Sequence, residues 1–354
     1  MEYPEMQGPV CPMPLKHVEK IVMGHGSGGK MSQELIHQVF QSEFTSDALL
    51  AGNDFAYLAD PEFNYARIVT SVDAHIVSPL FFPGGDIGNL AICGTVNDVA
   101  VAGAVPKFIT AAFILEEGLD VATLQKVVRS MKQSAEEAGV EIVSGDTKVV
   151  EKGKADGVFI TTTGIGYIPD GRTIHGANAQ PGDKIIISGN IGDHGIAVLA
   201  ARGDLGFETG VQSDVAPLNH MIETLLEAAP NVHVLRDPTR GGLATTLNEI
   251  AVQSNIGMLI DETKIPIQQA VQAASDMLGF DPLYIANEGK LIIIVPKNEC
   301  QAALTAIQST KYGKNAVIIG EVTADHPKRV LLQTYIGGTR ILDVMSGEML
   351  PRIC

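Results

Sequence analysis

The sequence contains no tryptophan, few aromatic residues and no long hydrophobic run. Aromatic residues make up 5% of the 354 positions, yet hydrophobic residues make up 45%. The interior is therefore expected to be aliphatic. No apolar stretch reaches the length of a membrane-spanning helix. Residues 1–20 lack the charged and apolar regions of a signal peptide, so we expect neither membrane insertion nor secretion.

Basic residues are also scarce. The chain has 25 Lys and Arg against 41 Asp and Glu, which gives a net charge of −16. Proteins that bind nucleic acid through its phosphates need a basic surface, so that class is excluded. A phosphate ligand would need metal ions or backbone N–H groups to offset the acidic charge.

Cysteine occurs four times, as Cys11, Cys93, Cys300 and Cys354, and never in CxxC spacing. This usage argues against a disulfide framework or a zinc site. It is typical of free thiols in a reducing compartment, so a cytoplasmic location is expected.

Glycine is abundant, with 37 residues, and one glycine-rich loop runs from Gly24 to Lys30. A short strand-like run precedes it and residues 31–40 have helical spacing. This arrangement presents backbone N–H groups to an anion. The nucleotide-binding patterns match only in part, because Met31 replaces the hydroxyl residue of a P-loop and Asp47 comes too early for a ribose ligand. We interpret the segment as another kind of phosphate-contacting loop; a plain flexible turn is the alternative.

Three aspartates are candidate metal ligands. Asp54 and Asp73 belong to strand-like segments, and Asp98 lies in a helix of small residues predicted over 87–103. A buried carboxylate is costly unless it is paired or metal-bound. Converging carboxylates suit a Mg²⁺ ion that bridges a polyphosphate. Each alone could be a cap or turn residue; together with the glycine loop they favour a metal site.

Two loops carry further polar candidates. A strand predicted over 140–143 ends at a segment with Asp146 and Lys148, which form either a structural ion pair or a phosphate or substrate contact. In the second half, Asp237 and Thr239 precede a helix predicted over 244–253. That position suits a phosphate or its metal ion.

Glu288 lies between apolar strands predicted at 283–285 and 291–295. Burial would raise its pKa and make it a usable general base or acid. The alternative is an exposed hairpin glutamate. His194, in a glycine turn, is interpreted as structural.

A turn-rich stretch near 167–181 separates two units. The expected organisation is a leader at 1–17, an N-terminal domain at 18–167, a C-terminal domain at 168–343 and a mobile tail at 344–354.

The tail ends in Cys354, whose thiolate would be a strong nucleophile if exposed and ionised. A neighbouring α-carboxylate raises the thiol pKa and Arg352 partly offsets it, so loading by a dedicated partner is expected. The tail spans roughly 35 Å when extended, enough to enter a pocket and to reach a partner. A frayed end is the alternative.

These segments together resemble the HypE family of hydrogenase maturation factors, among the PurM-like ATP-binding proteins. The resemblance runs from about residue 23 to 354. It rests on HGSGG (25–29), SPLFFPGGDIGNLAICGTVNDVAVAGA (78–104), FILEEGL (113–119), SGDTKVV (144–150), GDHG (192–195), RDPTRGG (236–242), ANEGKL (286–291), IGEV (319–322) and the final PRIC.

The resemblance implies a mixed α/β, PurM-like two-domain fold with a flexible C-terminal tail. The N-terminal domain would pair its sheet in a homodimer, with ATP near that junction. The implied activity is a lyase reaction: Cys354 receives a carbamoyl group from the carbamoyltransferase HypF, and ATP with Mg²⁺ drives dehydration of the thiocarboxamide to a thiocyanate. The cyano group would pass to iron on the HypC–HypD complex for the [NiFe] hydrogenase centre.

The resemblance also implies roles for individual residues. Cys354 would carry the substrate, Glu288 would be the base, and Lys148 would orient the thiocarboxamide or neutralise charge. The remaining assignments are Mg²⁺ at Asp54, Asp73, Asp98 and Asp237, phosphates at Gly26, Ser27, Gly28 and Gly29, and further nucleotide contacts at Asn97, Asp146, Thr147 and Thr239.

Two rival functions remain. One is another PurM-like synthetase, such as a selenophosphate or aminoimidazole ribotide synthetase, acting on a free small molecule. That function would leave Cys354 unexplained. The other is a non-catalytic carrier of a carbamoyl or cyano group, which would need no ATP chemistry.

Overall fold

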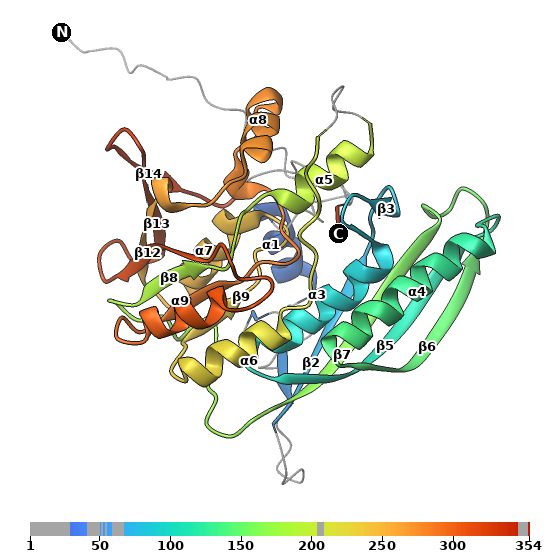
Figure 1. Ribbon diagram of the computed structural model, residues 1–354, viewed down its shortest axis with the longest axis horizontal. Coiled ribbons are helices and arrows are strands. Elements are labelled where there is room, and N and C mark those ends of the chain that lie inside the picture. The colour runs from blue at the N-terminus through green and yellow to red at the C-terminus, as the bar shows by residue number, and fades with distance from the viewer. Residues whose placement is uncertain are drawn as a thin grey trace.

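The computed structural model describes residues 29–40, 50, 52–53, 55–58, 67–203, 209–345 and 353–354. Two sheets, each covered by helices, lie side by side (Figure 1). Within the described residues no helix is both long enough and apolar enough to cross a membrane.

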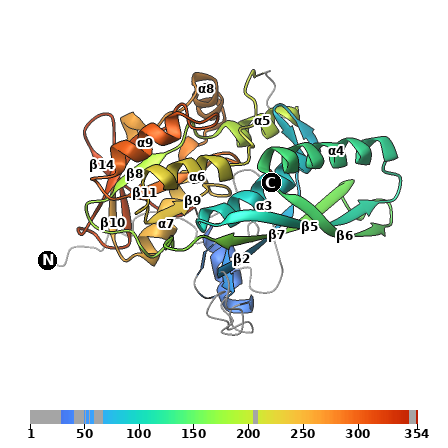
Figure 2. The same ribbon diagram turned by 60° about the horizontal axis from the view of Figure 1, so that its bottom comes forward.

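The N-terminal sheet has the strand order β1-β2-β7-β5-β6. Strands β5 and β6 pair in parallel, and the other neighbours are antiparallel. Helices α3 (Ile87–Val101) and α4 (Val121–Ala138) pack together along the sheet, as both views show (Figures 1 and 2). The strands are β1 (Ala56–Leu58), β2 (Arg67–His75), β5 (Val105–Glu116), β6 (Glu141–Val150) and β7 (Val158–Ile168).

Helix α3 is buried along nearly its whole length, because it is enclosed by the sheet, by α4 and by α6. Its small residues allow this close approach. Asp86 caps the helix by accepting hydrogen bonds from the backbone N–H groups of Gly88 and Asn89, at 2.7 and 3.1 Å. A Cβ atom on Gly88 would lie 2.3 Å from the carbonyl oxygen of Val127 in α4.

Replacing Gly88 with alanine is therefore expected to lower the free energy of unfolding by about 1–3 kcal/mol, since backbone must move to accommodate the methyl group. Denaturant unfolding measures this change. Gly210→Ala is the matched control, because a Cβ there meets nothing within 4 Å. Equal stability of the two variants would contradict the close helix contact.

The C-terminal sheet has the order β14-β13-β10-β12-β8-β11-β9. Helices α6 and α9 cover one face, and α7 packs on the other. Both faces are buried, which explains the unbroken isoleucine runs of β8 and β11. The strands are β8 (Lys184–Ile187), β9 (Val234–Arg236), β10 (Gly257–Asp261), β11 (Ile292–Val295), β12 (Val317–Thr323), β13 (Arg329–Gln333) and β14 (Thr339–Leu342). The helices are α6 (Asn219–Ala228), α7 (Gly242–Gln253) and α9 (Cys300–Gln308).

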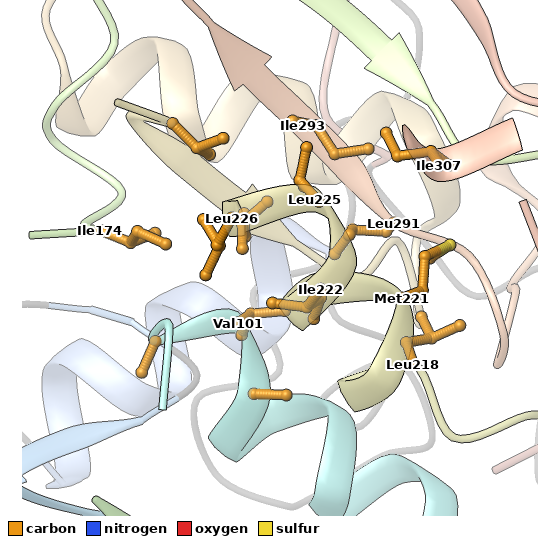
Figure 3. Packing of buried hydrophobic residues seen from close by; sticks show 14 of the residues in the cluster. Val101, Ile174, Leu218, Met221, Ile222, Leu225, Leu226, Leu291, Ile293 and Ile307 are labelled. Atoms are coloured by element: carbon orange, nitrogen blue, oxygen red, sulfur yellow. The ribbon is translucent and has the colours of Figure 1, made fainter. Parts of the chain in front are cut away.

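One hydrophobic cluster joins the two halves (Figure 3). Val101 at the end of α3 lies in the same cluster as Ile222 and Leu225 of α6 and Ile293 of β11. The two units therefore share a core and do not merely touch at a polar surface.

Shorter elements complete the described chain. They are α1 (Lys30–Leu35), the π-helical turn η2 (Ile36–Phe40), β3 (Phe81–Phe82), β4 (Gly85–Asp86), α5 (Asp193–Ala201), η3 (Glu262–Lys264), α8 (Gln269–Leu278) and η4 (Pro282–Tyr284).

Two sequence-based expectations for the elements were wrong. Residues 283–285 form no strand; Pro282 begins a 3₁₀ turn capped by Asp281. Residues 144–148 do not follow a strand but lie within β6, because they pair in parallel with β5. Asp73 lies in strand β2, as expected, and the helix expected over 87–103 is confirmed as α3.

Candidate active site

The last two residues dock against the segment that follows β2. Ile353 forms an antiparallel bridge with Val77, and the backbone N–H of Ile76 donates to an oxygen of the Cys354 α-carboxylate at 3.1 Å. The Ile353 side chain is buried in the cluster that contains Val77 and Phe82. The backbone therefore fixes where the Cys354 thiol lies.

The Cys354 thiol is partly buried and lies beside the Glu288 carboxyl group. Burial raises the thiol pKa far above its ordinary value, and the Arg240 guanidinium opposes the shift. The charge of Glu288 raises the pKa further. In this docked arrangement the thiol is protonated, so it is not a free nucleophile.

Glu288 is 4% exposed, which confirms the expectation that it is buried. Burial raises its pKa well above the ordinary carboxyl range. The charges of Asp73, Asp214 and Asp237 raise it further, whereas Arg240 lowers it. A carboxyl group with a raised pKa holds its proton to higher pH and is a stronger base once it is deprotonated, which suits a general acid or base. Its Oε1 atom has no hydrogen-bond partner in the described part of the chain.

A buried ion pair holds the Glu288 backbone in place. Asp214 accepts hydrogen bonds from the N–H groups of Glu288 and Gly289, at 3.1 and 3.3 Å, and from Lys290 Nζ at 2.9 Å. The Lys290 charge lowers the Asp214 pKa against the effect of burial, so the carboxylate stays ionised. Sequence reasoning missed Asp214, because it lies in a loop without any motif.

Arg240 was also missed, although it belongs to a motif noted in the sequence. The charges of Cys354, Asp73, Glu288 and Asp98 all raise its pKa, so the guanidinium faces this group. The turn that presents it needs glycine. Gly242 has φ of 61°, and a Cβ there would lie 2.7 Å from the carbonyl oxygens of two residues near η4. The available signal was a second arginine in the RDPTRGG motif, three residues after Asp237.

Three of the four predicted metal ligands lie in the described residues. Asp98 accepts a hydrogen bond from Ser71 at 2.8 Å, and the Asp73 carboxylate lies 3.6 Å from the His75 ring. Asp237 is 8% exposed. Asp54 lies outside the described residues. Among the residues described, no three His, Cys, Asp or Glu side chains are grouped closely enough to form a metal site by themselves.

The residues predicted to contact the nucleotide lie on more separate parts of the chain than the predicted metal ligands. Gly26, Ser27 and Gly28 lie outside the described residues; Gly29 is buried at the start of α1. Asn97 is 1% exposed and bridges the two halves: it accepts from the Leu218 N–H at 2.8 Å and donates to the carbonyl oxygens of residues 216 and 288. Its contact with nucleotide stays a prediction.

The predicted contacts at residues 146–148 lie on β6, which is exposed along its length. Lys148 Nζ donates to Asp146 at 2.8 Å, and both side chains are more than 60% exposed. Thr147 donates its own N–H to the same carboxylate. The ion pair considered from the sequence is therefore present, and a role in substrate binding stays a prediction. Thr239 accepts the Gly242 N–H through its carbonyl oxygen, which closes the turn before α7.

Two helix-covered sheets in one chain define a fold class rather than a single activity. The chain matches the models "AIR synthase related protein, N-terminal domain" over residues 52–168 and "AIR synthase related protein, C-terminal domain" over residues 180–333. These matches cover most of the chain. The expected mixed α/β, PurM-like fold is thereby confirmed.

Within that class the chain belongs to the HypE family of carbamoyl dehydratases. It is 53% identical over 335 residues to the carbamoyl dehydratase HypE of Cupriavidus necator, with 95% of each chain covered. A HypE structure solved in a HypE–HypF complex is 49% identical, with a TM-score of 0.83 and coverage of 88% of this chain and 99% of the other. A HypE structure in complex with ATP is 47% identical, with a TM-score of 0.79 and coverage of 95% and 100%.

Proposed function

We propose that this protein dehydrates a carbamoyl group carried on the Cys354 sulfur to a thiocyanate at the expense of ATP, and so supplies the cyanide ligand of a [NiFe] hydrogenase iron. The observation that carries the proposal is the position of the docked Cys354 beside the buried carboxyl group of Glu288. Relatives that are about half identical over nearly the whole chain are named carbamoyl dehydratases, which supports the same reaction.

The chemistry follows from the weakness of an amide oxygen as a leaving group. The thiocarboxamide oxygen attacks the γ-phosphorus of ATP, ADP leaves, and the nitrogen loses the first of its two protons to give an iminophosphate. A base then removes the remaining N–H proton, the C≡N bond forms, and phosphate departs with the former carbonyl oxygen. Phosphoryl transfer depends chiefly on positioning and charge neutralisation. In this proposal Glu288 takes the proton, and the Arg240 guanidinium offsets the charge that develops beside the sulfur.

The nucleotide assignment is part of the proposal and is supported by the relative solved with ATP. We place the phosphates at Gly26–Gly29, with Asn97, Asp146, Thr147 and Thr239 as further contacts and Lys148 beside the thiocarboxamide. Mg²⁺ uses one or two carboxylates together with phosphate oxygens, and Asp73 and Asp98 on adjacent elements fit that use. Asp54 and Asp237 complete the proposed set. The ion would neutralise charge on the phosphates during transfer.

Asp98→Asn is expected to raise the Mg²⁺ concentration required for half-maximal ADP formation at least about tenfold, because the amide keeps the Ser71 hydrogen bond but loses the negative charge. A Mg²⁺ titration with carbamoylated protein and saturating ATP measures this. Asp170→Asn, in an exposed turn, is the control. Identical titration curves for the two variants would remove Asp98 from the metal site.

The partners follow from the reaction. A carbamoyltransferase of the HypF type would load Cys354, in line with the relative solved in a HypE–HypF complex. An iron-bearing HypC–HypD complex would accept the cyano group. The free thiols Cys93, Cys300 and Cys354 fit a cytoplasmic location.

The homodimer is proposed from the N-terminal sheet. Strand β6 is at the sheet edge, and large exposed hydrophobic residues gather on this sheet. Unpaired edges and contiguous apolar surface are typical of sites covered by another chain. The exposed residues are Val72, Phe108, Ile114, Ile142, Val143, Val149 and Tyr167.

Val149→Lys is expected to weaken such a dimer at least about tenfold, because a charge would be buried at the interface. Val149 is 67% exposed in the single chain. Sedimentation velocity over a concentration series measures the dissociation constant. Val121→Lys, at a 70% exposed position on α4, is the control. The same dissociation constant in both variants would exclude this edge as the interface.

Intact-protein mass spectrometry tests the function itself. The chain is incubated with the carbamoyltransferase, carbamoyl phosphate and ATP, and Mg²⁺-ATP is then added to the purified product. A gain of one carbamoyl group followed by loss of one water is expected. Carbamoylation without water loss would establish the carrier. No modification would move the search to a synthetase that acts on a free small molecule.

A further inference from the structure

His194 is a fully buried histidine at the start of α5 that the proposed chemistry does not use. Its ring has two polar partners. Nε2 is hydrogen-bonded to the Ile353 carbonyl oxygen, and Nδ1 lies 2.8 Å from the Ser213 hydroxyl oxygen. One imidazole therefore joins α5, the loop before α6, and the residue that precedes Cys354.

The proton positions follow from these partners. A carbonyl oxygen only accepts, so Nε2 carries the hydrogen and donates it to Ile353. In the neutral ring Nδ1 then accepts from the Ser213 hydroxyl. Ser213 in turn accepts the Val215 N–H at 3.2 Å. Burial lowers the His194 pKa and keeps the ring neutral, although the charge of Asp214 and the bond to Ile353 oppose the shift.

Packing restricts the ring to this orientation. The Phe82 ring meets it edge to face, with centroids 5.5 Å apart and an angle of 89° between the planes. Phe82 and Ile353 also share a hydrophobic cluster. The Ser213 N–H donates to the carbonyl oxygen of Pro83 at 2.7 Å, which ties the second partner of the histidine to the same region.

We infer that His194 is a positioning residue that holds the Ile353 carbonyl group and thereby keeps the Cys354 sulfur against Glu288 while the substrate is dehydrated. The effect on dehydration rests on the proposed function, whereas the contact between His194 and Ile353 is observed in the structure. The hydrogen-bond partners of the His194 ring are Ser213 and the Ile353 carbonyl oxygen, neither of which is a reacting group. Loss of its N–H should release the docked segment without changing the reacting groups.

The first test is the alkylation rate of Cys354 in the unmodified full chain, measured with iodoacetamide and peptide mass spectrometry. His194→Phe keeps a flat ring but removes the Nε2 donor. Its Cys354 alkylation rate is expected to rise about two- to tenfold, the range that one net hydrogen bond gives. His220→Phe is the matched control. His220 lies on α6, and its ring also bonds a backbone carbonyl oxygen, that of Glu137 at 3.0 Å.

Glutamine at this position provides a rescue. The Gln side-chain amide places an N–H near the former Nε2, whereas the shorter Asn amide reaches only the former Nδ1. His194→Gln is therefore expected to restore slow alkylation and His194→Asn is not. If His194→Phe does not fold, the comparison of Cys354 alkylation rates between the Gln and Asn variants still tests the inference. Equal Cys354 alkylation rates in the Gln and Asn variants, or in the two Phe variants, would overturn the inference.

A second readout separates positioning from general loss of structure. Carbamoyl loading requires the thiol to be accessible, so His194→Phe should load at least as fast as the unmodified sequence. Its later loss of water should slow by about the same two- to tenfold. Slowing of both steps together would indicate a structural defect and count against the inference. Because alkylation requires neither the transferase nor ATP, it tests the role of His194 even if no dehydration occurs in any variant.

Discussion

Cys354→Ala is expected to abolish both the gain of a carbamoyl group and the later loss of water. The sulfur is the only atom that the proposed reaction attaches to substrate, so no partial activity should remain. The measurement is intact-protein mass spectrometry with the carbamoyltransferase, carbamoyl phosphate and Mg²⁺-ATP. The fold should be unaffected, since the thiol is only partly buried.

Cys300→Ala is the control for that experiment. Cys300 is the first residue of α9, is 4% exposed and belongs to no part of the proposed site. It should keep both mass changes. Carbamoylation that persists in Cys354→Ala would show that another nucleophile is loaded, and the assignment of the substrate-carrying residue would be wrong.

Glu288→Gln is expected to leave carbamoyl loading intact and to slow dehydration by about 10²- to 10⁴-fold, the usual contribution of a positioned general base. Glutamine is nearly isosteric and resembles the neutral carboxyl group that burial favours. The variant should therefore fold normally. Formation of the thiocyanate from pre-carbamoylated protein, followed by mass against time, measures the rate.

The pH profile provides a further readout. A base acts in its deprotonated form, and the Glu288 pKa is raised, so the rate of dehydration should rise with pH above the ordinary carboxyl range. Glu288→Gln should lose that rise. Glu299→Gln, whose exposed carboxylate bonds Asn231 far from the thiol, is the control and should keep it. An unchanged rate in Glu288→Gln would exclude Glu288 as the base.

Local sequence patterns predicted helices and strands well where burial of apolar side chains determines the element. The run of small and apolar residues over 87–103 predicted the helix that is α3, Ile87–Val101. The apolar run of residues 291–295 predicted the strand that is β11, Ile292–Val295. The burial of Glu288 was inferred from its apolar neighbours and is confirmed.

The contacts that complete the site could not be read from local patterns. Asp214 reaches Glu288 across 74 residues, and Asn97 reaches the same residue across 191. Arg240 gains its significance only from acidic groups on other elements. Residues 144–148 were misassigned because parallel pairing with β5, a distant partner, continues the strand through a segment rich in turn-forming residues.

The bridge between Ile353 and Val77 also determines the kinetics that such a protein can show. A substrate attached to Cys354 is held near the base by the docked backbone of residues 353–354. Its effective concentration at the base is therefore set by the geometry of the chain and not by the concentration of a free substrate. The first-order rate of dehydration should then be independent of protein concentration and saturate only with nucleotide. The rate would be limited by the fraction of time that the C-terminal residues are docked, because each chain carries only one equivalent of substrate.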